Sequence, residues 1–311
     1  MILKQVIEIA DMLDSAHIDG ETIVNLFSDY DFVQATAETV QGREGTTDFI
    51  KIIILGENGK LQNGNASSLG IIGRLGGIGA RPKRIGFVSD GDGAAAALST
   101  ALKLAEMSEK GDRLEGDVYI TTHICPHAPT KPHKPVEFMG SPVDILTMNQ
   151  YEVDEKMDAI ISIDTTKGNN VFNHKGISLS QTVKEGYILK FSEDLIRTQE
   201  MTTGELPATF ALSMQDITPY GNGLHHINSI LQPSVATNSP VVGVAITAES
   251  AIPGSGTGAS HEIDIAQAAR FSIEVAKEFG KGTLEFFDKK EFEHLRGLYG
   301  AMNHLQTKGI D

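Results

Sequence analysis

Apolar runs rich in β-branched residues alternate along the chain with polar, glycine-containing segments and with longer amphipathic stretches. The run FIKIIIL at 49–55 is closed by Gly-Glu-Asn-Gly, a pattern typical of a strand followed by a turn. Similar runs predict strands over 84–89, 116–122, 158–163 and 240–247. Helical patterns cover 94–107, 266–279 and 288–306. Because strands alternate with helices, the pattern predicts an α/β protein with a largely parallel sheet.

The ends of the chain give weaker patterns. Residues 1–40 are predicted to be helical, with a break at Asp19-Gly20-Glu21. We therefore expect residues 1–45 to form an N-terminal helical appendage and residues 46–311 to form a single α/β domain. Within that domain, residues 177–215 contain only short strand-like runs.

Composition narrows the classes of function. The chain has 311 residues, of which 40% are hydrophobic, which is enough for a sizeable core. Its net charge of -15 argues against a nucleic-acid partner, because phosphate binding relies on clustered Lys and Arg. No apolar stretch is long enough for a membrane span and the start does not resemble a signal sequence, so a cytoplasmic protein is expected. The only cysteine, Cys125, leaves histidines and carboxylates to hold any metal.

Acidic and histidine side chains cluster at the predicted ends of strands and the start of a helix. They are Asp90, Asp92, His123, His127, Asp164 and His261. The carboxyl ends of parallel strands lie at one edge of a sheet, so these side chains are expected to meet there. They are ligand types for a divalent cation such as Zn²⁺ or Mn²⁺, which activates a bound water. The pattern therefore predicts a metal site at this edge.

Each of these residues also has a structural alternative. Asp90 or Asp92 could cap the helix that follows, and His261 also stands directly before a helix. Asp164 could simply pair with Lys167, and His123 and His127 lie among prolines that favour a surface loop. The Gly-rich stretch 70–80 lacks the order of a P-loop or dinucleotide fingerprint, and we expect a tightly packed loop there.

Four motifs resemble a family of bacterial and archaeal proteins known as a domain of unknown function. They are GFVSDGDG, THICPHAPTKPH, IDTTKGN and QDITPYGNG. The resemblance runs from Ile71 to Gln306. More remotely, the order of elements is similar to the di-zinc aminopeptidase superfamily, which includes deblocking and glutamyl aminopeptidases. That similarity implies a three-layer sandwich around a mostly parallel, mixed central sheet.

The same resemblance implies roles for individual residues. Asp90 matches the metal-bridging aspartate of those enzymes, with Asp92 as the near alternative, and Asp164 and His261 match two further ligands. The Glu-Glu pair that supplies their general base is replaced here by the region of Pro126-His127, and no His-x-Asp motif precedes Asp90. The inserted dimerisation domain common in those enzymes also has little room here.

The leading hypothesis is a metal-dependent hydrolase of an amide or peptide-like small substrate. Zinc is the expected metal, with manganese or iron as alternatives. Asp90, Asp92, His123, Asp164 and His261 are the candidate ligands, His127 is a candidate base, and His225 or His226 would polarise the substrate carbonyl. The expected partners are the small substrate and further copies of the chain in a homo-oligomer, with neither nucleic acid nor membrane.

Two further hypotheses belong to other classes. The chain is alternatively a non-catalytic binding or assembly protein that has lost part of a metal site, an interpretation that the missing Glu-Glu pair favours. A third hypothesis is an enzyme with Cys125 as nucleophile and His123 or His127 as its base.

Overall fold

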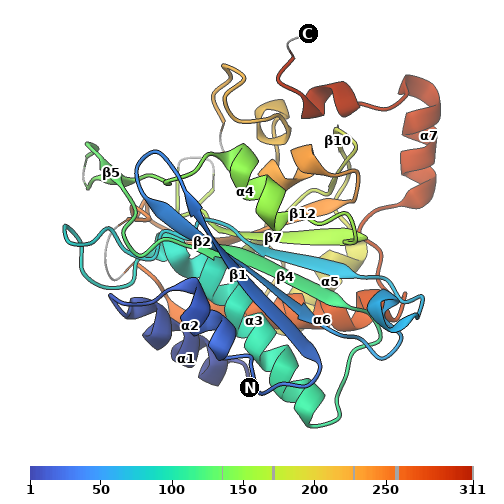
Figure 1. Cartoon of the computed structure of the whole chain (residues 1–311). Coiled ribbons are helices and arrows are strands. Elements are labelled where there is room, and N and C mark those ends of the chain that lie inside the picture. The colour runs from blue at the N-terminus through green and yellow to red at the C-terminus, as the bar shows by residue number, and fades with distance from the viewer. Residues whose placement is uncertain (135, 170–171, 227, 256–258, 310–311) are drawn as a thin grey trace.

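A mixed ten-stranded sheet forms the centre of the computed structural model, which describes residues 1–311 except 135, 170–171, 227, 256–258 and 310–311 (Figure 1). The strand order is β1-β2-β4-β3-β7-β12-β8-β11, and the short strands β9 and β10 join beside β12. The strands are β1 (Val33–Gln41), β2 (Thr46–Ile54), β3 (Leu69–Gly73), β4 (Val118–Ile124), β7 (Ala159–Thr165), β8 (Gly176–Ser180), β9 (Val183–Lys184), β10 (Tyr187–Ile188), β11 (Thr209–Phe210) and β12 (Val241–Thr247). A separate hairpin contains β5 (Thr130–Lys131) and β6 (Phe138–Met139).

The middle of the sheet is parallel and its first edge is antiparallel. Strands β4, β3, β7 and β12 run in the same direction, whereas β1 and β2 form a hairpin whose second strand is antiparallel to β4. Every residue of β3, β4 and β12 is buried, as expected for strands that are covered on both faces. The predicted α/β fold with a mixed sheet is confirmed.

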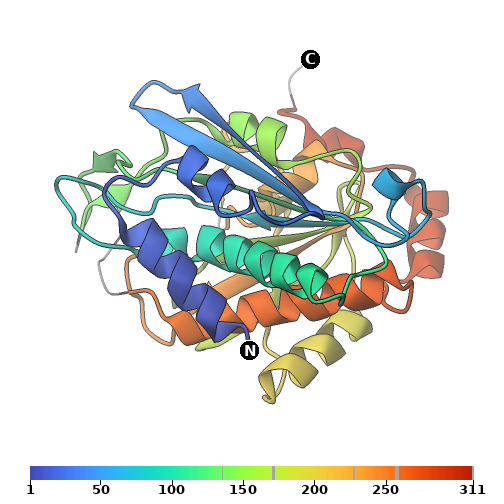
Figure 2. The same ribbon diagram turned by 60° about the horizontal axis from the view of Figure 1, so that its bottom comes forward.

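Helices cover both faces of this sheet. On one face α1 (Leu3–Asp14), α3 (Asp92–Glu109) and α6 (Glu262–Gly280) lie side by side, with α5 (Glu193–Thr203) next to α6 (Figure 2). The opposite face carries α4 (Ile145–Glu152), while the short α2 (Gly20–Asn25) contacts β1 and β2. The last long helix is α7 (Lys289–Tyr299). No helix in the described part of the chain combines the length and apolarity that a membrane span requires.

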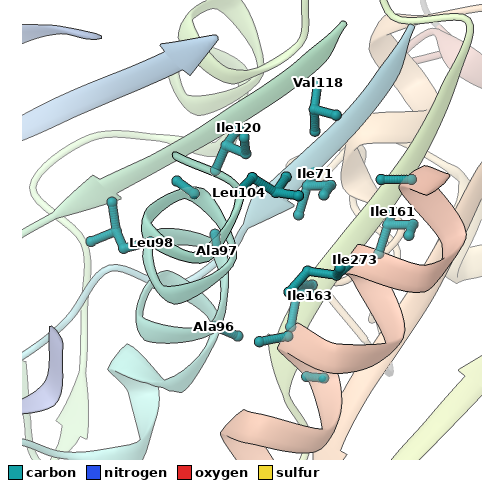
Figure 3. Packing of buried hydrophobic residues seen from close by; sticks show 14 of the residues in the cluster. Ile71, Ala96, Ala97, Leu98, Leu104, Val118, Ile120, Ile161, Ile163 and Ile273 are labelled. Atoms are coloured by element: carbon teal, nitrogen blue, oxygen red, sulfur yellow. The ribbon is translucent and has the colours of Figure 1, made fainter. Parts of the chain in front are cut away.

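The main core lies between the sheet and the pair α3 and α6. Leu104 of α3 and Ile273 of α6 lie towards Ile71 of β3 and Ile161 of β7 (Figure 3). Leu98 of α3 belongs to the same buried cluster. Small side chains let α3 approach the sheet closely, since four consecutive alanines at 94–97 are fully buried. This packing fixes the start of α3 against the carboxyl end of β3.

Two glycines make the contact at that end tight. A Cβ on Gly93 would lie 2.4 Å from the carbonyl oxygen of Arg74, and one on Gly73 would lie 2.5 Å from the carbonyl oxygen of Gly93. No side chain fits at either position without moving the backbone. Asp90 and Asp92, at the start of α3, are therefore held close to the ends of β3 and β7.

The N-terminal segment differs from its prediction. Residues 33–40, predicted to be helical, belong to β1, because pairing with β2 along nine residues outweighs their mixed local preference. Val6, Ile9 and Leu13 of α1 are fully buried in the same core cluster as the sheet. The expected boundary after residue 45 falls in the turn between the paired strands β1 and β2.

Other elements also depart from the predicted pattern. The predicted strand over 84–89 is largely irregular and ends in a short 3-10 helix that begins at Ser89. Gly86 has φ +94° and Ile85 is 80% exposed, which does not suit a strand in the sheet. The strand that leads into α3 is instead β3, which begins the Gly-rich stretch predicted as a loop. Helix α5 occupies part of the range where only short strands were predicted.

Candidate functional site

A cavity of about 740 Å³ opens at the carboxyl ends of the parallel strands, where the start of α3, the ends of β4 and β7, and α4 converge. Its polar side includes Asp90, Thr165, Lys167, Tyr220, Asn228 and Ser229. Its apolar wall consists of Phe138, Met139, Pro142, Val143, Ile145 and Leu146. A cavity of this size, with a few polar groups facing apolar ones, is typical of a small-molecule site.

Asp90 and Asp92 flank the turn that leads into α3. The backbone N–H of Asp90 donates to the carbonyl oxygen of Gly254 at 3.0 Å. Asp92 is fully buried, accepts a hydrogen bond from Oγ of Ser260 at 2.5 Å, and forms an ion pair with Nζ of Lys167 at 3.3 Å. The N-cap of α3 is Gly91, and no side chain caps it. The capping alternative for these two aspartates is therefore wrong.

Asp164 is the third carboxyl group at this edge. It lies near the end of β7, where one oxygen accepts from Oγ of Ser229 at 2.8 Å and the other from the backbone N–H of Thr165 at 2.6 Å. Burial raises the pKa of Asp164 to about 6, although these hydrogen bonds and the charge of Arg74 oppose the rise. The alternative in which Asp164 pairs with Lys167 is not what is observed, since Lys167 pairs with Asp92.

The pKa values of the other two aspartates are raised further. Burial, followed by the charges of Asp164 and Asp92, raises the pKa of Asp90 to about 7, and Lys167 opposes this shift. Burial also raises the pKa of Asp92 to about 7 against the opposing effects of Lys167 and Ser260. Near neutral pH, Asp90 therefore exchanges between its acid and base forms while it faces the cavity.

A second charged cluster lies beside the cavity and is fully buried. Glu152, the last residue of α4, forms an ion pair with Arg74, which directly follows β3, and accepts a hydrogen bond from Nδ1 of His123 at 2.5 Å. Burial alone would raise the pKa of Glu152, but Arg74 and His123 outweigh it and lower the pKa below its usual value. We call Arg74, His123 and Glu152 the buried triad.

His123 has no free ring nitrogen in this arrangement. Its Nε2 accepts a hydrogen bond from the backbone N–H of Gly76 at 3.1 Å, so the ring proton resides on Nδ1, which faces Glu152. A histidine binds a metal through an unprotonated nitrogen, and both nitrogens here are already engaged. His123 also lies within β4 rather than in the predicted loop after it.

The remaining predicted residues are dispersed. His127, His225 and His261 are exposed, with His261 as the N-cap residue of α6, and none of them is among the residues that line the cavity. His226 stacks on Tyr220, with ring centroids 4.1 Å apart, and its Nε2 lies 2.9 Å from the carbonyl oxygen of Thr218. His226 therefore packs against the ring of Tyr220, which lines the cavity.

Cys125 lines the cavity but lacks the features of a nucleophile. The residue is buried, its Sγ donates to the carbonyl oxygen of Thr46 at 3.5 Å, and burial raises the pKa of the thiol to about 11. A reactive cysteine needs a lowered pKa, usually from a neighbouring cation.

The predicted metal ligands do not form one coordination group. In the described part of the chain, no three His, Cys, Asp or Glu side chains are placed to hold a metal ion together. The negative charges of Glu152 and Asp92 already have cationic partners in Arg74 and Lys167. The arrangement therefore does not fit the predicted zinc site.

Sequence reasoning missed several residues of this region. Arg74 and Glu152 were not singled out, although their charges are buried in the core, and Tyr220 and Ser229 were passed over as part of a polar loop. Position offers a signal for Arg74, which directly follows β3 at the edge where α/β proteins bind ligands. Glu152 gives no such signal, because its partners lie 29 and 78 residues away along the chain.

The structure is an α/β fold with a cavity at the carboxyl edge of its sheet. The chain belongs to the family described as "Protein of unknown function (DUF1177)", whose model matches residues 38–309. Comparison with curated proteins gives no match.

Proposed function

We propose that this protein is a hydrolase of a small amide or peptide-like substrate, with Asp90 as the group that transfers protons. The observation that carries the proposal is a carboxyl group that lines a cavity of about 740 Å³ with its pKa raised to about 7. A group whose pKa lies near the working pH serves well as either acid or base. Burial and the neighbouring aspartates provide the shift here.

The proposed reaction uses this group twice. The carboxylate of Asp90 accepts a proton from a water molecule while the water oxygen bonds to the carbonyl carbon of the substrate. The same proton then passes to the substrate nitrogen as the C–N bond breaks, which releases an acid and an amine. The ammonium of Lys167, which lines the same cavity, would stabilise the negative charge that develops on the carbonyl oxygen.

The proposal does not use a metal, because the predicted ligands do not form a coordination group in the described residues. A metal-dependent hydrolase is the second candidate, and one observation favours it. Asp164 and Asp92 both raise the pKa of Asp90, and a divalent cation would offset such repulsion between carboxylates. Metal content of the purified protein separates the two candidates.

The test is a hydrolysis screen with short peptides and acyl amides, run on the full chain before and after dialysis against EDTA. Asp90→Asn should reduce the turnover by about 10²- to 10⁴-fold, because an amide cannot relay the proton. Wild-type kcat/KM should rise as the pH passes through about 7, and the variant should lose that inflection. Asp112→Asn, an exposed change outside the cavity, should leave turnover unchanged.

Other outcomes decide among the alternatives. Equal turnover in Asp90→Asn and the wild type contradicts the proposal. Loss of activity with EDTA and recovery with zinc would instead support the metal-dependent enzyme. Cys125→Ala should keep its activity, since a thiol with a pKa of about 11 is almost wholly protonated at neutral pH. Binding without turnover of any compound would support the non-catalytic alternative.

A further inference from the structure

The apolar wall of the cavity provides information about the substrate that the charged side does not. Phe138 and Met139 come from β6, Pro142 and Val143 from the following loop, and Ile145 and Leu146 from the first turn of α4. Three consecutive elements thus place apolar side chains along one side of the same cavity that Asp90 and Lys167 line.

Two side chains of this wall are unusually open to solvent. Phe138 is 60% exposed and Leu146 is 37% exposed, whereas their neighbours Met139 and Val143 are buried. An exposed apolar group is unremarkable when it stands alone, but two that line one cavity form a surface that a ligand can cover. Both residues line the cavity that Asp90 and Lys167 also line, so one occupant of this cavity can contact the apolar wall and the polar side together.

The polar side restricts the other end of this occupant. Asp90 accepts or donates a proton there, Lys167 donates only, and the side chains of Asn228 and Ser229 add neutral hydrogen-bonding groups. Because both signs of charge are present, a neutral head with a carbonyl acceptor and an N–H donor fits this side. An amide has both groups.

We propose that the substrate is an amide with an apolar arm of several carbon atoms, which lies along the wall formed by residues 138–146. This inference rests on the proposed function for the chemistry of the head, while the arm follows from the wall alone. Phe138 and Leu146 are then the residues that determine specificity for the length of the arm. Asp90 determines the reaction.

The test measures binding along a series of N-acyl glycinamides, from acetyl to octanoyl, by isothermal titration calorimetry on the full chain. Each added methylene that becomes buried should tighten binding by about threefold to fourfold, until the wall is covered. The double variant Phe138→Ser/Leu146→Ser should flatten this dependence, so that the octanoyl compound loses far more affinity than the acetyl compound does. Leu298→Ser, an equally polar change at an exposed position on α7, should keep the wild-type dependence.

The outcomes separate this inference from the proposed function. An affinity that does not change with chain length, or the same dependence in wild type and double variant, overturns the inference even where Asp90→Asn abolishes hydrolysis. A length dependence that disappears in the double variant supports it even where no compound is hydrolysed. Failure of the octanoyl compound to bind at millimolar concentration also overturns it.

Discussion

The two charged clusters at the carboxyl edge of the sheet contain similar residues but differ in how far their negative charges are paired with positive ones. In the buried triad, one carboxylate faces one guanidinium and a neutral imidazole, and the pKa of Glu152 is lowered. Around the cavity, Lys167 pairs with Asp92 and also opposes the shift at Asp90, yet the pKa values of Asp90, Asp92 and Asp164 are all raised. The first cluster is neutralised within the fold, whereas the second retains an excess of acid.

This difference indicates what each cluster contributes. A fully paired buried charge holds its neighbours in one geometry, and the triad joins β3, β4 and α4, which surround the cavity. An incompletely paired carboxyl group costs stability, and proteins keep such groups where they react or bind. The triad therefore supports the site, and Asp90 is the residue to which the proposed reaction assigns proton transfer.

The largest effect is expected from breaking the triad. Glu152→Gln keeps the shape of the side chain but leaves the buried Arg74 without its countercharge, so it should lower the free energy of unfolding by about 3 to 5 kcal/mol. Urea unfolding at pH 7, followed by circular dichroism, measures this loss.

The matched control is Glu155→Gln, an exposed change three residues further along the chain. It should change the free energy of unfolding by less than about 0.5 kcal/mol. If Glu152→Gln were as mild as this control, the triad would not be the support of the site.

The opposite effect is expected at Asp90. Its pKa is about 7 in the folded chain, against 3.8 for an unperturbed aspartate, so the folded state binds the proton more tightly than the unfolded state does. The stability that protonated Asp90 provides is fully present below pH 4 and is lost as the pH rises to about 7. Asp90→Asn should therefore be more stable than the wild type at pH 8, by about 2 to 4 kcal/mol.

The same variant should match the wild type only below about pH 3, where Asp90 is protonated in both the folded and the unfolded state. Unfolding in urea across about pH 3 to 8 gives the two curves and their difference. A constant difference at all pH values would mean that the charge of Asp90 is not destabilised by the fold, and the contrast with Glu152 would disappear.

The parts of the fold that could be predicted from sequence are the central strands, which are buried on both faces of the sheet. The apolar runs before Asp164 and over 240–247 correspond to β7 and β12, because central parallel strands bury both faces and leave a continuous apolar pattern. The edge strand β1 lacks this pattern, since most of its residues are exposed. Its conformation is set by pairing with β2, and a short stretch of sequence around β1 does not show this pairing.

The site shows the same limit at the level of single residues. The strand-helix alternation placed Asp90, Asp92 and Asp164 at one edge, and they lie there because β3 and β7 are parallel neighbours and α3 begins beside them. Sequence proximity to a predicted strand or helix was misleading for His123 and His261, since it does not show what a ring nitrogen contacts or where a side chain faces. His123 is engaged by Gly76 and Glu152, and His261 is exposed.

The smallest expected effect tests how the acidic cluster is stabilised. Oγ of Ser229 donates to Asp164 at 2.8 Å, and this bond opposes the rise of the pKa of Asp164. Ser229→Ala should raise that pKa above about 6 and should lower the stability at pH 8 by about 1 to 2 kcal/mol. At pH 5 the loss should be smaller, because a protonated Asp164 gains less from the bond.

The control is Ser239→Ala, which removes a 2.7 Å hydrogen bond to the backbone oxygen of Met157 and should show a loss of stability that does not depend on pH. Equal behaviour of the two serine variants across this range would mean that Asp164 remains in one protonation state, and the excess of acid at the cavity would then be smaller than its three carboxyl groups suggest.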